Sequence, residues 1–127
     1  MHTNAAIIGV GQSAYTRRPQ PGQSTHTFIR DAVVAALADA EIDPREVDGM
    51  AIASFSLAPD AAIDLAWKLG LSLRWLVQDT NGGSSAMNML GHALRAVESG
   101  AASVILVTAG MPPGLAATPR WRLISTP

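Results

Sequence analysis

A glycine turn followed by two serines is the part of the sequence best suited to chemistry. Asn81, Gly82 and Gly83 precede Ser84 and Ser85, and the pattern predicts that a helix begins at about Ser85. Unpaired backbone N–H groups and the positive end of the helix dipole would therefore point at the turn, where they can stabilise an anion or an oxyanion. Serines are also ordinary helix caps and glycine turns are common, so a structural and a functional interpretation both stay open.

Other residue types give little support for a second kind of site. The three histidines, His2, His26 and His92, do not have the spacing of metal ligands. The chain contains no cysteine, which excludes disulfides, thiolate zinc sites and a cysteine nucleophile. The serines after Gly82 do not lie in the nucleophile elbow of serine hydrolases, and His92 lies two turns further along the same helix. We therefore predict no metal site and no serine hydrolase.

Composition restricts the class of protein further. The chain of 127 residues is 48% hydrophobic and 15% charged, which favours one compact domain with an extra apolar surface to bury. A net charge of −1 provides no positive field, so we expect neither nucleic-acid binding nor binding to a membrane surface. No apolar stretch approaches the roughly 20 residues of a spanning helix. We predict a cytoplasmic location.

Alternating strands and helices are predicted from the spacing of the hydrophobic residues. We expect α/β architecture in layers, with a four-stranded, mainly parallel sheet. The predicted strands cover residues 5–10, 50–55, 73–77 and 103–109, and the predicted helices cover about 24–40, 59–70 and 85–99. A short helical turn is predicted at 43–46, because Asp43 can cap it and Glu46 can reach back to the cap.

Two of these helices carry more specific predictions. Ile63, Ala66 and Trp67 are expected to form the inner face of the short helix at 59–70. The helix at 85–99 has apolar residues around most of its circumference and includes Gly91, so we predict a buried central helix. After Gly110 the periodicity stops, which divides the chain into a domain at 1–110 and an irregular tail at 111–127.

One motif formally matches the glycine fingerprint of dinucleotide-binding proteins. It runs from Gly9 through Gly11 to Ala14 and directly follows a predicted strand. The next helix begins only near Ser24, after a segment with two prolines, so no helix N-terminus would face a phosphate. We interpret the glycines as residues that turn the chain off a buried strand.

Three segments together resemble the thiolase superfamily, in its thiolase-like, lipid-transfer-protein branch, whose members are similar to acetyl-CoA acetyltransferases. They are residues 6–13, residues 31–49, and the Asn81 turn with the helix and strand that follow it up to Gly110. The resemblance covers residues 5–110 and implies a partial thiolase-like fold that corresponds to the N-terminal part of the family's chain. It also implies a role in acyl-CoA and lipid metabolism, including sterol metabolism.

The resemblance places the thiolase nucleophile at Gly83, which has no side chain to react. A cysteine is favoured there because a helix N-terminus lowers the pKa of a thiol, whereas a serine would need a base. The family's acid–base residues come from later in its chain, so no catalytic residue is assigned here. The substrate-binding residues that the resemblance implies are Asn81, Gly82, Gly83, Ser84 and Ser85.

The leading hypothesis is therefore a truncated or N-terminal part of a thiolase-like protein that does not turn over substrate alone. It implies a coenzyme A thioester as substrate and no cofactor, with a homodimer or a complementing polypeptide as partner. Two alternatives remain. The chain could be a non-catalytic dimerisation or partner-binding module, or a component of a thiolase-like carbon–carbon lyase, an aldolase complex.

Overall fold

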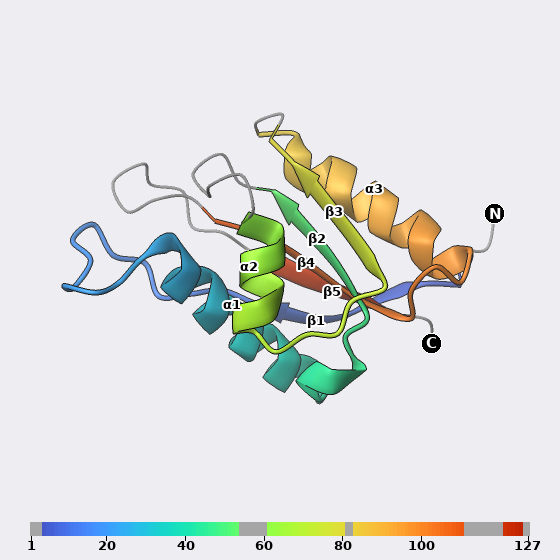
Figure 1. The fold of residues 1–127 in the computed structure, drawn as a ribbon, viewed down its shortest axis with the longest axis horizontal. Helices are drawn as coiled ribbons and strands as arrows, with labels where there is room; N and C mark the ends of the chain where they lie inside the picture. The colour runs from blue at the N-terminus through green and yellow to red at the C-terminus, as the bar shows by residue number, and fades with distance from the viewer. Residues whose placement is uncertain (1–3, 54–60, 81–82, 111–120, 126–127) are drawn as a thin grey trace.

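Strands and helices alternate along the chain in the computed structural model, which describes residues 4–53, 61–80, 83–110 and 121–125. Figure 1 shows the elements in chain order. They are β1 (Ala6–Gly11), α1 (Thr25–Ala40), the 3₁₀ turn η1 (Pro44–Glu46), β2 (Gly49–Ala53), α2 (Ala61–Lys68), β3 (Trp75–Asp79), α3 (Ser85–Glu98), β4 (Val104–Ala109) and β5 (Trp121–Ser125).

The strands form one five-stranded sheet in the order β1-β5-β4-β2-β3. Strands β4, β2 and β3 are parallel, and β5 is antiparallel to both of its neighbours. The predicted α/β class is confirmed, but the sheet has five strands and not four. The expected irregular structure is wrong for Trp121–Ser125, which lies between β1 and β4 and takes its regular conformation from hydrogen bonds to both.

Helices cover both faces of the sheet (Figure 1). Ile52 and Leu106 belong to a hydrophobic cluster that includes buried residues of α1 and α2. Ala51 and Ile105 point to the opposite face and pack with buried residues of α3. Because successive side chains alternate between faces, strands covered on both sides are apolar throughout. The mostly apolar sequence of β4 (Val104–Ala109) has this origin.

The two glycines of β1 allow α1 to lie close against the strand. A Cβ atom at Gly11 would lie 2.2 Å from the carbonyl oxygen of Ala32, and one at Gly9 would lie 2.5 Å from that of Ala36. Helix α1 begins only at Thr25, so its N-terminus does not follow the glycine motif directly. The rejection of a nucleotide site agrees with this placement, but both glycines lie within the strand and do not turn the chain off it.

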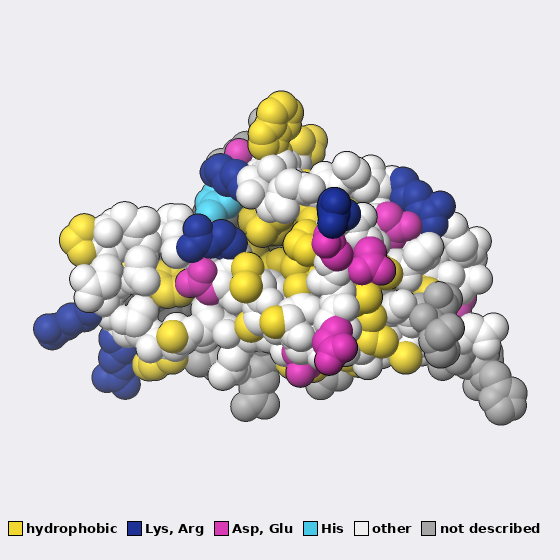
Figure 2. Space-filling view, turned by 90° about the horizontal axis from the view of Figure 1, so that it is seen from below, with side chains coloured by type: hydrophobic (Ala, Val, Ile, Leu, Met, Phe, Trp, Pro, Cys, Tyr) yellow, Lys and Arg dark blue, Asp and Glu magenta, His cyan; other side chains and the backbone are white. Residues whose placement is uncertain are grey.

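Helix α2 is rotated relative to the predicted orientation, so that only Ala66 of the three predicted inner residues is buried. Ala62, Leu65 and Ala66 are buried, whereas Ile63 is 63% and Trp67 84% exposed. Figure 2 shows hydrophobic side chains projecting at the top of the view, over the region of α2. The sequence contains two overlapping apolar stripes at helical spacing, and the structure buries the one with smaller side chains.

Helix α3 is not enclosed within this chain. It buries one stripe against the sheet, formed by Ser85, Met89, Ala93, Ala96 and Val97, while Met87 on another side is 69% exposed. The predicted burial on several sides is wrong here because the sheet covers only one side of the helix and no other described element covers the rest (Figure 1).

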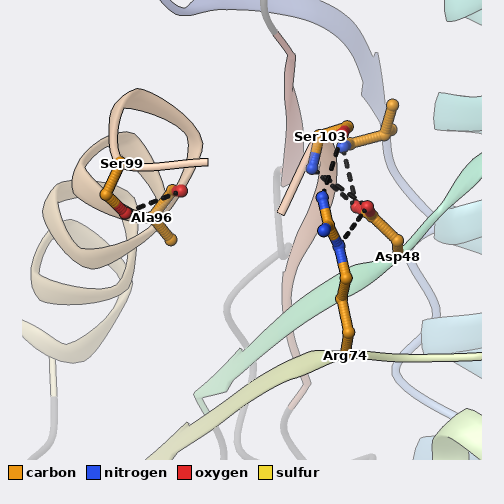
Figure 3. A network of polar contacts seen from close by, with 6 residues as sticks. Asp48, Arg74, Ala96, Ser99 and Ser103 are labelled. Atoms are coloured by element: carbon orange, nitrogen blue, oxygen red, sulfur yellow. Dashed lines mark hydrogen bonds and ion pairs between the residues drawn. The ribbon is translucent and has the colours of Figure 1, made fainter. Parts of the chain in front are cut away.

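Asp48 ties together the amino ends of the three parallel strands (Figure 3). Its carboxylate accepts the backbone N–H groups of Ser103 at 2.8 Å and Val104 at 2.9 Å. It also accepts the Nε–H of Arg74 at 2.8 Å. These bonds hold the start of β4 and the start of β3 against the residue that precedes β2. They fix the end of the sheet opposite to the predicted turn.

Candidate functional site

The N-terminus of α3 opens at the carboxyl edge of the parallel strands. Ala53, at the end of β2, pairs in register with Asp79 of β3 and Ala109 of β4. In open α/β sheets this edge is where ligands commonly bind. The predicted glycine turn joins β3 to α3 there, although Asn81 and Gly82 lie outside the described residues.

Gly83, the position that matches the thiolase nucleophile, faces open space. A Cβ atom built on it meets no atom within 4 Å, and its φ angle lies outside the left-handed range. The residue is exposed. The backbone therefore has room for a side chain at this position, and the absence of a nucleophile is a property of the sequence and not of crowding.

Ser84 is the N-cap residue of α3, as the sequence predicted. Its carbonyl oxygen accepts the N–H groups of Met87 and Asn88, both at 3.1 Å, while its hydroxyl makes no capping bond. The first turn of α3 also contains no acidic side chain. The positive end of the helix is thus not neutralised by its own residues, which leaves it suited to an anionic ligand group.

Ser85 points in another direction from its neighbours. It is 3% exposed, and its Oγ has no hydrogen-bond partner among the residues that the structure describes. It begins the buried stripe of α3, so its side chain faces the sheet. A buried hydroxyl without a partner costs roughly 1–3 kcal/mol in proteins. Of the predicted site residues, the structure therefore places Gly83 and Ser84 at the surface and Ser85 in the interior.

Thr108 is a second buried hydroxyl, which the sequence analysis did not single out. It is 0% exposed, and its Oγ1 also lacks a partner among the described residues. It shares a face of β4 with Leu106, on the α1 side of the sheet, whereas Ser85 lies on the α3 side. The feature of the sequence that could have identified Thr108 is a hydroxyl residue within an otherwise apolar strand. The two hydroxyls do not form one site.

The remaining polar candidates lie elsewhere. His92 is exposed on α3, where its Nδ1 lies 3.4 Å from Nη2 of Arg95. Within the described ranges, no three His, Asp or Glu side chains are grouped in a way that could hold a metal ion. None of the helices in those ranges has the length and hydrophobicity required to cross a membrane.

The electrostatics of the turn can be measured with an introduced thiol. We expect Gly83→Cys to give a thiol whose pKa lies below the usual value of about 8.5, because a helix N-terminus stabilises the thiolate. The chain has no other cysteine, so the rate of alkylation by iodoacetamide as a function of pH reports this group alone. Ser72→Cys, at an exposed loop position, is the control. Identical pH profiles for the two variants would contradict the prediction.

Comparison with known proteins identifies a carboxyl-CoA lyase and a steroid side-chain-cleaving aldolase as relatives. The 17-hydroxy-3-oxo-4-pregnene-20-carboxyl-CoA lyase of Mycobacterium tuberculosis is 32% identical over 103 residues, covering 80% of this chain and 26% of the lyase. The steroid side-chain-cleaving aldolase of Thermomonospora curvata is 31% identical over 103 residues, covering 80% of this chain and 25% of the aldolase. A scan of protein families found no match.

Comparison with solved structures also identifies an aldolase. The Ltp2-ChsH2(DUF35) aldolase superimposes with a TM-score of 0.75 and 28% identity, covering 91% of this chain and 29% of the aldolase chain. The chain has a partial thiolase-like fold. The priming β-ketosynthase of a polyketide pathway superimposes with a TM-score of 0.80 at 18% identity, covering 97% of this chain and 50% of that chain.

The resemblance to thiolase-like proteins is thus confirmed, and so is its partial extent. The relatives are steroid side-chain-cleaving aldolases or lyases, and the structural neighbours are thiolase-like enzymes. This thiolase-like chain spans about a quarter of the length of the curated relatives it matches.

Proposed function

We propose that this thiolase-like chain is a component of a carbon–carbon lyase that acts on coenzyme A thioesters in lipid metabolism, including steroid side-chain degradation. The observation that carries the proposal is the N-terminus of α3, which has no acidic or capping side chain and lies beside the open position at Gly83. The printed activities of the two relatives, a carboxyl-CoA lyase and a side-chain-cleaving aldolase, support the substrate class.

Retro-aldol cleavage fits the residues at the turn better than acyl transfer does. Cleavage of a β-hydroxy thioester breaks one carbon–carbon bond, passes the electron pair to the thioester enolate, and requires a base to take the hydroxyl proton. It needs a positive site for the enolate oxygen and no covalent nucleophile. A glycine at position 83 permits this reaction, whereas acetyl-CoA acetyltransferase chemistry requires a group that carries the acyl unit.

In this proposal, a second polypeptide supplies the catalytic base that the turn lacks. The described turn residues Gly83, Ser84 and Ser85 include no acidic or basic side chain, so we assign proton removal to a complementing polypeptide. The neighbour named as an Ltp2-ChsH2 aldolase, a two-component name, supports such an arrangement. We place the assembly in the cytoplasm.

Binding of coenzyme A and acetyl-CoA, measured by isothermal titration calorimetry, tests the proposal. We expect saturable binding by the chain, weakened about two- to tenfold in Ser84→Asp, because a carboxylate at this exposed position would neutralise the positive end of α3. Ser84→Asn is the matched control. It introduces a side chain of the same size without the charge, and asparagine is also a favourable N-cap residue, so binding should not change. Absence of saturable binding by the unaltered chain would refute the proposal.

A non-catalytic dimerisation or partner-binding module is the second candidate function. The exposed side of α3, with Met87 at 69% exposure, favours it. A tight dimer that is indifferent to coenzyme A would select this candidate over the lyase component.

A further inference from the structure

An apolar groove lies between helix α3 and the start of β1. Helix α3 packs mainly against β2 and β4, in the middle of the sheet, whereas β1 is the strand at the edge (Figure 1). The groove has a volume of about 450 Å³, and its lining side chains are apolar, or absent at the glycine: Ala5, Ala6, Ile7, Met87, Leu90, Gly91 and Leu94. Ile7 is 43% and Met87 is 69% exposed, so the groove opens to solvent.

The size of the groove suits a small molecule better than a second polypeptide. Ligand sites in proteins commonly have volumes of about 300–1,000 Å³. At about 30 Å³ for each group of the size of a water molecule, 450 Å³ holds about 15 non-hydrogen atoms. A stable interface between polypeptides uses about 20–30 residues on each side, whereas seven residues line the groove.

A positive charge lies at the rim of the groove. The guanidinium of Arg95 reaches back over Gly91, and its Nη1 would lie 3.7 Å from a Cβ atom at that glycine. Among the described residues no carboxylate forms an ion pair with Arg95, whose Nη2 lies 3.4 Å from Nδ1 of His92. A guanidinium binds a carboxylate through two parallel hydrogen bonds. Arg95 therefore offers a partner to an anionic group directly beside an apolar surface.

We propose that this groove binds a medium-chain fatty acid, with the carboxylate on Arg95 and the hydrocarbon chain against α3 and the start of β1. A chain of about 10–12 carbons has, with its two carboxyl oxygens, about 12–14 non-hydrogen atoms, which the groove accommodates. Each methylene group that leaves water for the apolar lining favours binding. The guanidinium selects an acid over a neutral molecule of the same length.

The groove is separate from the glycine turn. Gly91 lies eight residues from Gly83 in the sequence, about 12 Å along the axis of a helix. A free fatty acid contains no coenzyme A, so its binding does not depend on the site at the N-terminus of α3. The proposal is therefore independent of the proposed lyase function, and a chain that failed to bind coenzyme A would leave it standing.

Isothermal titration calorimetry of the full chain with sodium decanoate, below the concentration at which decanoate forms micelles, provides the first test. We expect saturable binding at one site. 1-Decanol has the same chain without the charge, so it is expected to bind at least threefold more weakly. The expected ratio is modest because Arg95 is exposed to solvent, which weakens its interaction with an anion.

Two substitutions by glutamine on α3 test the role of the charge. Arg95→Gln is expected to weaken decanoate binding at least threefold, because it removes the guanidinium. Glu98→Gln is the matched control, since it removes an opposite charge three residues further along the same helix. Both residues are exposed, and glutamine is a good helix former, so both variants should stay folded. Glu98→Gln should bind decanoate no more weakly than the unaltered chain.

A larger side chain at Gly91 tests the location. Gly91→Leu is expected to weaken decanoate binding at least tenfold, because its side chain occupies the groove and displaces the guanidinium. Nothing but the Arg95 side chain lies within 4 Å of a Cβ atom at Gly91, and leucine is a better helix former than glycine, so the variant should stay folded. Ala38→Leu, on the exposed side of α1, adds the same side chain elsewhere and should leave binding unchanged.

Any of four results would overturn the proposal. The first is the absence of saturable decanoate binding by the unaltered chain, and the second is a decanol affinity equal to that of decanoate. The third is an Arg95→Gln variant that binds decanoate as well as Glu98→Gln does. The last is a Gly91→Leu variant with the affinity of the unaltered chain.

Discussion

Replacing Gly11 by alanine is expected to destabilise the fold by about 3 kcal/mol, at the upper end of overpacking effects, because the added atom meets backbone and not a movable side chain. Its Cβ would lie 2.2 Å from the Ala32 carbonyl oxygen and 2.3 Å from the backbone nitrogen of Ala36. No change of rotamer relieves such contacts, so α1 has to move away from β1. Urea unfolding followed by circular dichroism measures the loss.

Gly83→Ala is the control for this experiment. The open space around Gly83 accepts a methyl group without contact, so its effect on the free energy of unfolding should stay within about 0.5 kcal/mol. An equal effect of the two substitutions would show that α1 does not depend on the absence of a side chain in β1.

Local sequence patterns predicted the elements that depend on local physics. The turn before α3 was found because glycines and serines stop one element and begin another, and η1 was found from the capping pattern of Asp43 and Glu46. The structure shows the complete capping box at η1, in which the Glu46 carboxylate accepts the N–H of Asp43 at 2.9 Å. The strands at β2 and β4 were found because burial on both faces leaves a short, mostly apolar run.

Features that depend on distant partners could not be predicted in the same way. β5 is five residues long, and its conformation depends on the place between β1 and β4. The predicted inner face of α2 was wrong for Ile63 and Trp67, because the helix has two overlapping apolar stripes and only the shape of the core selects the one that is buried. Burial of α3 was overestimated because apolar residues show only that a side of the helix is suited to packing. The sequence does not show whether another element of this chain packs on that side.

The sequence predicted where the candidate site lies in the fold but not how its residues are oriented. Sequence placed Gly83, Ser84 and Ser85 at a helix N-terminus, which the structure confirms. It could not show that Ser85 turns inward while Gly83 faces open space, because these directions follow from how α3 is rotated against the sheet.

Replacement of Asp48 by asparagine is expected to have the second large effect on stability. The Asp48 side chain bonds to residues that are distant in the sequence. Its bonds reach Arg74, 26 residues away, and Ser103, 55 residues away. Asparagine keeps the size of the side chain but loses the charge and one acceptor oxygen, so a donor at the start of β4 or on Arg74 is left unpaired. Bonds to charged groups contribute about 1.5–3 kcal/mol, and we expect a loss of about 2 kcal/mol in urea unfolding at pH 7.

The pH dependence of stability gives this prediction its sharpest form. Burial raises the pKa of Asp48, but hydrogen bonds from the backbone N–H groups of Val104 and Ser103 and from Arg74 outweigh burial and hold the pKa below its usual value. A carboxyl whose pKa is lower in the folded state stabilises the fold above its unfolded pKa, about 3.9 for aspartate. That contribution is lost as the pH falls below about 3.9 and through the folded pKa. Asp48→Asn should therefore be less stable than the unaltered chain at pH 7, and the difference should shrink toward pH 2.

Asp43 provides the control, because a large pKa shift there has little structural consequence. The Arg45 side chain and backbone N–H lower the pKa of Asp43 to about 2, yet both partners lie on the same exposed turn and hold no distant segments together. Asp43→Asn should change the urea midpoint at pH 7 much less than Asp48→Asn does. If Asp43→Asn lowered the midpoint as much, the stability would depend on the local charge pair at η1, and Asp48 would not be the residue that fixes the amino ends of β2, β3 and β4.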